Sequence, residues 1–389
     1  MRKGSNFLGN KVITISAIAL VVFGSLMIAS AEMGNSVGDT DYLSGVILKQ
    51  SVSAVVGIIA YFVCMHINLY KRNDNFFKAI YIGILIALLA CRVFGQINGA
   101  YAWIRFGSMS VQPSEFAKVF MIVFGGKILG NDDGKENLDN LLTFVKYAAI
   151  YFVIIAFYQK DLGSAVVLFT ICYCILMIPP YREYQKVQRW MRIGIVAAIG
   201  FIVFVFSPIF TNFLMKFSDN YMIGRFLAAA NPFLYRYDNG YHVIMSLVSF
   251  ANGGLFGLGY GNSIHKYMNF PNPSNDFILP VIVEELGVIG FIAFVGGYCA
   301  LLVPLVKASF KSKYISSKIV YLGVFTYFVV HFILNVGGVS AIIPLTGVPL
   351  LLISSGGSSL VASMCGLGFA QCELIRNKAI NNESNSREV

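Results

Sequence analysis

The chain has 389 residues, of which 57% are hydrophobic and 12% charged, and its formal net charge is +10. A mean hydropathy of +0.71 indicates a polytopic membrane protein and excludes the two or three soluble domains that the length alone would suggest. The basic residues are dispersed among apolar runs and form no massed tract, which argues against nucleic acid as a partner.

Apolar runs that approach the length needed to span a bilayer, about 20 residues, recur along the whole chain. Shorter runs also qualify where side chains at their ends reach the interface. We therefore expect an all-α polytopic membrane protein with ten transmembrane helices. No separate soluble domain is expected, so residues 1–389 form a single membrane domain. The ten segments are 12–30, 51–69, 79–94, 113–129, 144–157, 162–179, 193–210, 286–306, 319–334 and 358–375.

Lysine and arginine residues gather at alternate ends of these segments. With ten helices all these clusters fall on one side, and the positive-inside rule places that side and both termini in the cytoplasm. The polar C-terminal tail, residues 377–389, is expected to be disordered and cytoplasmic. The opposite side holds residues 211–285, which we expect to form a large extracytoplasmic loop between the seventh and eighth helices.

Three carboxylates lie close together near the end of that loop, in a chain where carboxylates are scarce. Asp276, Glu284 and Glu285 stand at the entrance to the apolar run 277–306. A charge at the edge of a hydrocarbon layer costs roughly a few kcal/mol unless it is paired or wet, so these residues predict a functional site. The glycine-rich stretch 253–261 cannot form a regular helix and must line water or protein. We interpret this region as the wall of an active site on the outer face of a membrane.

The sequence QPSEFAK marks the start of the fourth apolar segment. Pro113 suits the first helical position, and Glu115 and Lys118 are three residues apart, within ion-pair reach on one helix face. They predict either a capping box with a satisfied salt bridge or a site that holds an anionic substrate, and the sequence favours neither. In QKDLG, Asp161 is placed to cap the sixth helix, which we favour over a functional role.

The segment 335–360 has no charged residue and is rich in glycine, proline, serine and threonine. That composition argues against one straight helix, and irregular backbone at the membrane face is tolerated where it lines a cavity. Gly356, Gly357, Ser358 and Ser359 stand at a helix start, whose N–H groups favour anions such as phosphate. On its own the segment favours a re-entrant packing loop. The four histidines are scattered, and we expect them to be packing or surface residues.

Six motifs occur in the order and at the spacing of one known family. With them the chain resembles, over nearly its whole length, the SEDS family of bacterial cell-wall proteins, the RodA, FtsW and SpoVE group. No single motif would suffice, but six in this order do not match by chance. They are NGAYAWIRFG with QPSEFAK, QKDLGSA, RFLAAANPF with DNGYHVIMSL, GGLFGLGYGNS, FPNPSNDFILPVIVEELG and PLTGVPLLLISSGGSSL.

The resemblance implies a peptidoglycan glycosyltransferase with ten helices, in the bacterial cytoplasmic membrane. Such a protein polymerises lipid II, a disaccharide peptide on undecaprenyl pyrophosphate, for elongation, division or sporulation. The implied partners are a class B penicillin-binding protein that cross-links the product, and other elongasome or divisome membrane proteins. In the family the aspartate before the eighth helix is essential for polymerisation, and here that position is Asp276. The other matching positions are Glu115, Lys118, Asp161, Lys266, Glu284, Glu285 and the 356–359 turn.

The chain departs from the family pattern at four positions. Ser274 and Asn275 replace the usual His-Thr pair before the aspartate, which removes a titratable group. Ala102 stands where an arginine is common, and Ser355 replaces the usual tyrosine before the double glycine. Arg105 is close enough in sequence to substitute for the missing arginine.

The implied reaction is an inverting glycosyl transfer, in which a sugar hydroxyl attacks an anomeric carbon and undecaprenyl pyrophosphate leaves. We assign Asp276 as the base for that hydroxyl. The pyrophosphate needs positive charge, which Mg²⁺ or Mn²⁺ could also supply, and no organic cofactor is expected. The candidate groups for the pyrophosphate are Lys118, Lys266, Arg105, Arg225 and the N–H groups of the 356–359 turn.

Two alternatives from other classes remain. The intramembrane charges of Glu115 and Lys118 and the broken segment near Pro344 are also features of carriers, so the protein could transport lipid II across the membrane. The second alternative is a non-catalytic scaffold for a class B penicillin-binding protein, which is in keeping with the missing histidine and arginine.

Overall fold

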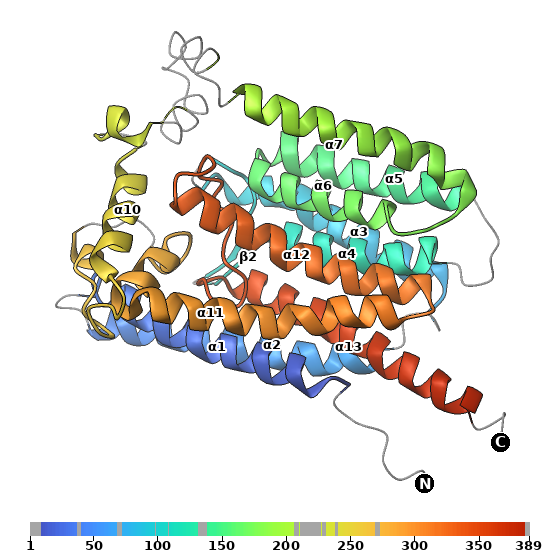
Figure 1. The fold of residues 1–389 in the computed structure, drawn as a ribbon, viewed down its shortest axis with the longest axis horizontal. Helices are drawn as coiled ribbons and strands as arrows, with labels where there is room; N and C mark the ends of the chain where they lie inside the picture. Colours follow the sequence, from blue (N-terminus) through green and yellow to red (C-terminus); the bar gives the residue numbers. More distant parts are fainter. Residues whose placement is uncertain are drawn as a thin grey trace.

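The computed structural model describes residues 9–36, 40–67, 72–97, 99–107, 109–130, 138–205, 210, 227, 231–237, 240–268 and 273–385. Long helices form one bundle, in which α1 begins and α13 ends at the end opposite to α10 (Figure 1). The long helices and their bounds are α1 (Lys11–Glu32), α2 (Thr40–His66), α3 (Asp74–Ala90), α4 (Pro113–Leu129), α5 (Leu138–Val153), α6 (Leu162–Leu176), α7 (Gln185–Val205), α10 (Tyr241–Gly253), α11 (Ile278–Lys311), α12 (Ile315–Val339) and α13 (Gly357–Asn385).

Short elements connect these helices. A π-helical turn, Ile154–Tyr158, extends α5, and a small antiparallel hairpin of β1 (Ile104–Phe106) and β2 (Met109–Val111) precedes α4. The all-α expectation omitted this hairpin, whose strands have only three residues each. The 3-10 turns are Cys91–Phe94, Arg182–Tyr184, Pro232–Tyr235 and His265–Tyr267.

The ten apolar segments expected from the sequence overlap ten of the helices, α1 to α7 and α11 to α13. Among the described residues, seven helices are long and apolar enough to cross a membrane: α1, α2, α3 and α5 with their extensions, α11, α12 and α13. The chain is therefore a multi-pass membrane protein. The remaining three are not among these seven: α4 and α6 have only 17 and 15 residues, and part of α7 lies outside the residues whose side chains the structure describes.

Three expected boundaries were wrong. The second helix begins at Thr40, well before residue 51. The helix expected over 286–306 begins at Ile278, so Glu284 and Glu285 lie inside α11 and not in the loop before it. The last helix continues to Asn385, so most of the tail expected to be disordered is helical.

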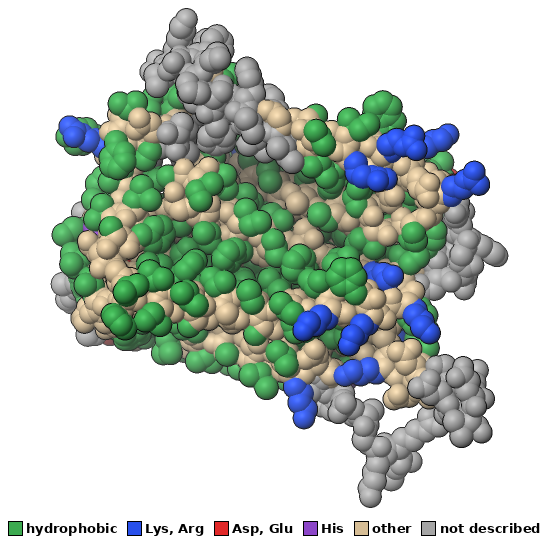
Figure 2. Space-filling model, viewed as in Figure 1, with side chains coloured by type: hydrophobic (Ala, Val, Ile, Leu, Met, Phe, Trp, Pro, Cys, Tyr) green, Lys and Arg blue, Asp and Glu red, His purple; other side chains and the backbone are tan. Residues whose placement is uncertain are grey.

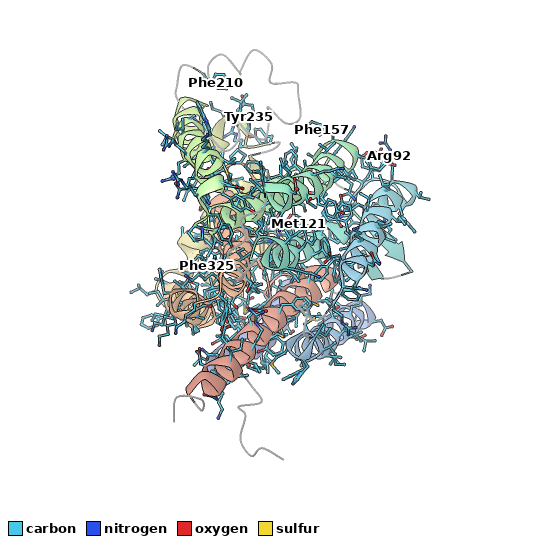
Figure 3. All side chains as sticks on the ribbon, turned by 90° about the vertical axis from the view of Figure 1, so that its right-hand side faces the viewer. Arg92, Met121, Phe157, Phe210, Tyr235 and Phe325 are labelled. Carbon is cyan, nitrogen blue, oxygen red and sulfur yellow. The ribbon has the colours of Figure 1, made fainter. Side chains whose placement is uncertain are left out.

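α4 is the central helix of the bundle. Fourteen of its residues are buried, on all sides of the helix, as expected for a helix that neighbours cover all round. Met121, near its middle, is fully buried and lies inside the bundle, while Phe157 and Arg92 lie near its edge (Figure 3). Stacked rings of Phe120 and Phe124, with centroids 5.5 Å apart, pack between α3 and α5.

α11 is interrupted at Gly287, whose φ of 67° is one that glycine favours. The glycine-rich loop 254–259 lies in this break. Two of its N–H groups donate to the carbonyls of Glu284 and Glu285, each at 2.9 Å, and so satisfy groups that lost their helical partners. A Cβ on Gly257 would lie 2.2 Å from the Glu285 carbonyl oxygen, which explains the glycine there. The loop 254–259 thus packs against the break in α11 through its backbone, while several of its side chains are exposed.

The surface of the bundle is largely apolar between its two ends. Figure 2 shows hydrophobic side chains over most of the face in view and basic side chains gathered mainly at the end where α11 ends and α7 begins. Exposed apolar residues such as Ile15 on α1, Ile86 on α3 and Ile292 on α11 are typical of lipid contact.

Candidate active site

Asp276 lies between two parts of the chain at the end of the bundle that carries α10. It is half-buried in the turn 273–277, directly before α11. The loop 340–356, which connects α12 to α13, passes beside it: a Cβ on Gly347 would lie 3.7 Å from Asp276 Oδ2. This irregular loop has no charged residue, as the sequence analysis noted. The aspartate expected to be catalytic is therefore in a partly accessible place, next to backbone that could line a cavity.

The 356–359 turn lies close to the same segment. α13 begins at Gly357, and Ser359 Oγ donates to the Gly356 carbonyl at 3.0 Å. The backbone N–H of Ser355 donates to the Ser274 carbonyl at 2.7 Å, two residues before Asp276. The structure thus places the start of α13 against the segment that carries Asp276.

Lys266 and Glu285 form a buried ion pair between the segment 263–268 and α11. Lys266 Nζ lies 2.9 Å from Glu285 Oε1, and neither side chain has any exposed surface. Ser30, near the end of α1, donates to both carboxylate oxygens, at 2.6 and 2.7 Å, and lies 3.1 Å from the ammonium. The pair therefore joins α1, α11 and the segment that carries the lysine.

Glu284 has a separate set of partners. His265 Nδ1 donates to its Oε1 at 2.7 Å, and Ser263 Oγ donates to its Oε2 at 2.5 Å. Asn252 Nδ2, on α10, donates at 3.3 Å. Because charge buried without partners is costly, these contacts explain how a carboxylate without exposed surface is tolerated.

Lys266, Glu284 and Glu285 were expected to bind the substrate. In this structure their charged groups are buried and bonded to protein partners. They hold the segment before Asp276 in place.

Glu115 and Lys118 form a second buried cluster, on α4. Lys118 Nζ lies 2.6 Å from Glu115 Oε1, and Tyr327 donates to Oε2 at 2.6 Å. His331 lies 3.4 Å from Lys118 through Nε2 and 3.0 Å from the Pro349 carbonyl through Nδ1. Because a carbonyl only accepts, Nδ1 carries the proton, and Nε2 accepts from the ammonium.

The salt bridge expected at the start of α4 is thus present, but the capping box is not, because the N-cap side chain makes no capping hydrogen bond. Glu115 and Lys118 are each at most 1% exposed. The Lys118 ammonium, expected to contact the pyrophosphate, is bonded to Glu115 and His331 in this structure. Through His331 the pair contacts the loop beside Asp276.

Asp161 caps α6, which is the role favoured from the sequence. Its Oδ1 accepts from the backbone N–H of Ser164 at 3.0 Å. Its Oδ2 accepts from Gln112 Nε2 at 2.9 Å, which ties the starts of α4 and α6 together. A Cβ on Gly163 would lie 2.7 Å from the Thr346 carbonyl, so this corner also touches the loop beside Asp276.

Two arginines were candidates for the pyrophosphate. Arg105 lies in β1, paired with Ser110 of β2, and its side chain is exposed. It can therefore meet an anion at the surface of the bundle. Arg225 lies outside the described residues.

Two of the four departures from the family pattern are in contact with each other. Ser355 bonds to the backbone of Ser274, and the Ser274 hydroxyl donates to Glu32 at the end of α1. The Glu32 carboxylate also accepts from Tyr42 at 2.9 Å. The Ser274 hydroxyl therefore attaches the Asp276 segment to α1.

Several residues of the site escaped the sequence analysis. His265 and His331, expected to be packing or surface residues, each bond to buried charged groups. Ser30, Glu32 and Tyr327 lie within apolar helices, where a lone polar residue gives no sign of its partner. In the described part of the chain, no group of three histidine, cysteine or acidic side chains could hold a metal ion.

Comparisons with known proteins agree with this architecture. The model of a family described as cell cycle protein, FtsW, RodA and SpoVE, matches residues 10–373. The "probable peptidoglycan glycosyltransferase FtsW" of Bacillus subtilis is 32% identical, over 91% of this chain and 88% of that protein. The stage V sporulation protein E of the same organism is 29% identical, over 92% and 94% of the two chains.

Two solved structures share the fold. A chain solved for the "structural coordination of polymerization and crosslinking by a peptidoglycan synthase complex" superposes with a TM-score of 0.70 at 22% identity, covering 94% of this chain and 97% of that one. The rod shape determining protein RodA of Thermus thermophilus gives a TM-score of 0.57 at 20% identity, covering 94% and 96%.

Proposed function

Because this chain belongs to the FtsW, RodA and SpoVE family of cell cycle proteins, we propose that it polymerises lipid II at the outer face of the bacterial cytoplasmic membrane. The chain is a peptidoglycan glycosyltransferase of cell-wall synthesis, in line with the names of relatives that match it over nearly their whole length. Its substrate, its residue roles and its orientation are our proposal. The position of Asp276, half-buried beside an uncharged irregular loop, carries that proposal.

Asp276 is the general base of the proposed reaction. An acceptor sugar hydroxyl forms a bond to the anomeric carbon of the donor, and the bond from that carbon to the pyrophosphate oxygen breaks. The hydroxyl proton passes to the Asp276 carboxylate, and the electron pair of the broken bond leaves with the undecaprenyl pyrophosphate. Attack from the face opposite to the leaving group inverts the anomeric centre.

The pyrophosphate leaves with additional negative charge, which needs stabilisation. The exposed side chain of Arg105 and the N–H groups of the 356–359 turn support this role. A Mg²⁺ or Mn²⁺ ion bound to the pyrophosphate of the substrate would supply further positive charge.

The orientation proposed here rests on charge. The basic side chains gather mainly at the end of the bundle where α11 ends (Figure 2), and the positive-inside rule places such an end in the cytoplasm. Both termini are then cytoplasmic, and Asp276 lies at the outer end. The ten-helix count, with residues 211–285 outside the membrane, belongs to the same proposal.

A class B penicillin-binding protein is the proposed partner. The structural neighbour from a peptidoglycan synthase complex that coordinates polymerization and crosslinking supports this pairing. Other elongasome or divisome proteins join according to whether the chain serves elongation, division or sporulation.

We expect faster polymerisation when the cognate partner is co-purified, and equal turnover in a complex shown to be intact would contradict the pairing.

A transporter of lipid II is the second candidate, because the buried Glu115 and Lys118 pair is of a kind found in carriers. Purified protein supplied with lipid II in detergent separates the candidates on a gel of the products. A polymerase lengthens glycan chains without a membrane to cross. A transporter yields no chains but moves lipid II across vesicles, and a scaffold yields none while it activates its partner.

A further inference from the structure

The turn that carries Asp276 is held by three successive hydrogen bonds. Residues 273–277 form neither helix nor strand, so their carbonyl groups need partners from elsewhere. The carbonyls of Ser274, Asn275 and Asp276 each accept one such bond. Their donors, in that order, are Ser355 N at 2.7 Å, Ser354 Oγ at 2.7 Å and Asn335 Nδ2 at 3.0 Å.

Asn335 joins the turn to the loop that faces it. Its side chain is 3% exposed, near the end of α12. The amide nitrogen donates to the carbonyls of Asp276 and Val348, each at 3.0 Å, and an amide has two hydrogens to give. One residue before Val348 is Gly347, the position whose Cβ would approach the Asp276 carboxylate. Asn335 therefore holds both sides of the space in which the carboxylate lies.

Ser354 makes the corresponding link further along the loop. It is also 3% exposed. Its hydroxyl donates to the Asn275 carbonyl at 2.7 Å and accepts from the backbone N–H of Leu350 at 2.9 Å. The same oxygen thus closes a turn of the loop and attaches that turn to the residue before Asp276.

We propose that Asn335 and Ser354 are positioning residues, which fix the Asp276 carboxylate relative to the loop and so to the sugar hydroxyl. This inference rests on the proposed role of Asp276 as the base. A base on an irregular turn must be held to within roughly 0.5 Å to act, and buried hydrogen bonds to its backbone supply that precision. Neither residue needs to touch the substrate.

Asn335→Leu and Ser354→Ala test this in purified full-length protein supplied with lipid II in detergent. Leucine keeps the size of the asparagine but cannot donate. We expect kcat to fall about tenfold to a hundredfold, with KM changed by less than about twofold, because substrate binding persists. The matched control is Ser309→Ala, near the far end of α11 from Asp276, whose hydroxyl donates to the Val306 carbonyl of the same helix. Unchanged kcat in folded Asn335→Leu and Ser354→Ala proteins would overturn the proposal.

Each variant is also combined with Asp276→Asn. If Asn335 and Ser354 act through Asp276, adding either substitution to Asp276→Asn should change the residual rate by less than about twofold. Losses that multiply fully in the double variants would overturn the positioning role while leaving Asp276 as the base. An Asp276→Asn protein of undiminished rate would instead overturn the role of Asp276 as the base, and a wild-type protein that forms no glycan chains would overturn the proposed function. Ser354→Ala removes only one hydroxyl, so its rate can still be measured and tests the proposal even if Asn335→Leu does not fold.

Discussion

Asp276→Asn is expected to lower the rate of lipid II polymerisation by about 10²–10⁴-fold, which is what a positioned general base contributes. Asparagine has nearly the same shape as aspartate but no carboxylate to accept the hydroxyl proton. The acceptors of the three hydrogen bonds that hold the turn are backbone carbonyls. The substitution therefore leaves these bonds in place. Gel analysis of the glycan products measures the rate, and the thermal midpoint in detergent measures the fold.

Asp74→Asn is the matched control. Asp74 is also a carboxylate at a helix start, but its side chain is 83% exposed and its partner is Lys127, 2.9 Å away. An exposed ion pair contributes about 0–1 kcal/mol, so both stability and polymerisation should stay close to those of the wild type. A similar loss of rate in the two variants would show that removing a charge, and not removing a base, lowers activity.

Lys266→Met is expected to destabilise the protein by about 3–5 kcal/mol, the cost of leaving a buried charge without its partner. The Glu285 carboxylate would keep Ser30 as a donor but would lose the ammonium 2.9 Å away, in a place without exposed surface. Because this cluster holds the segment before Asp276, polymerisation should fall together with stability. Denaturation of the purified protein in detergent measures the change.

Two further variants test the cause of that loss. Lys127→Met removes the lysine that pairs with the exposed Asp74 and should cost far less than Lys266→Met, because the carboxylate left behind stays in contact with water. Adding Glu285→Gln to Lys266→Met removes the stranded charge and should recover much of the lost stability. Equal losses for Lys266→Met and Lys127→Met, or no recovery in the double variant, would contradict the account of a buried ion pair.

The sequence alone allowed the approximate positions of the main helices to be predicted, and it identified Asp276 as a candidate site residue. Hydropathy located ten segments because lipid imposes apolar runs on helices, and the scarcity of charge pointed to Asp276, Glu284 and Glu285. It could not distinguish their environments. Glu284 and Glu285 are buried and paired, whereas Asp276 is half-buried, and the partner Ser30 is 255 residues away from Glu285 in the chain.

Other parts of the site depend on contacts that no local pattern records. His331 and Asn335 are one helical turn apart, yet only the path of the loop beside α12 makes both of them its partners. The break at Gly287 was missed because glycine within an apolar run does not by itself end a helix. The tail was expected to be disordered from its polarity, but α13 continues through it as far as Asn385.

The dependence of turnover on pH tests most directly whether Asp276 acts as a base. A base must be deprotonated to accept the hydroxyl proton, so acid should lower the rate of the wild type. The residual rate of Asp276→Asn should lack that decline, since asparagine does not titrate. The same acidic decline in both proteins would assign it to another group and would contradict the proposed mechanism.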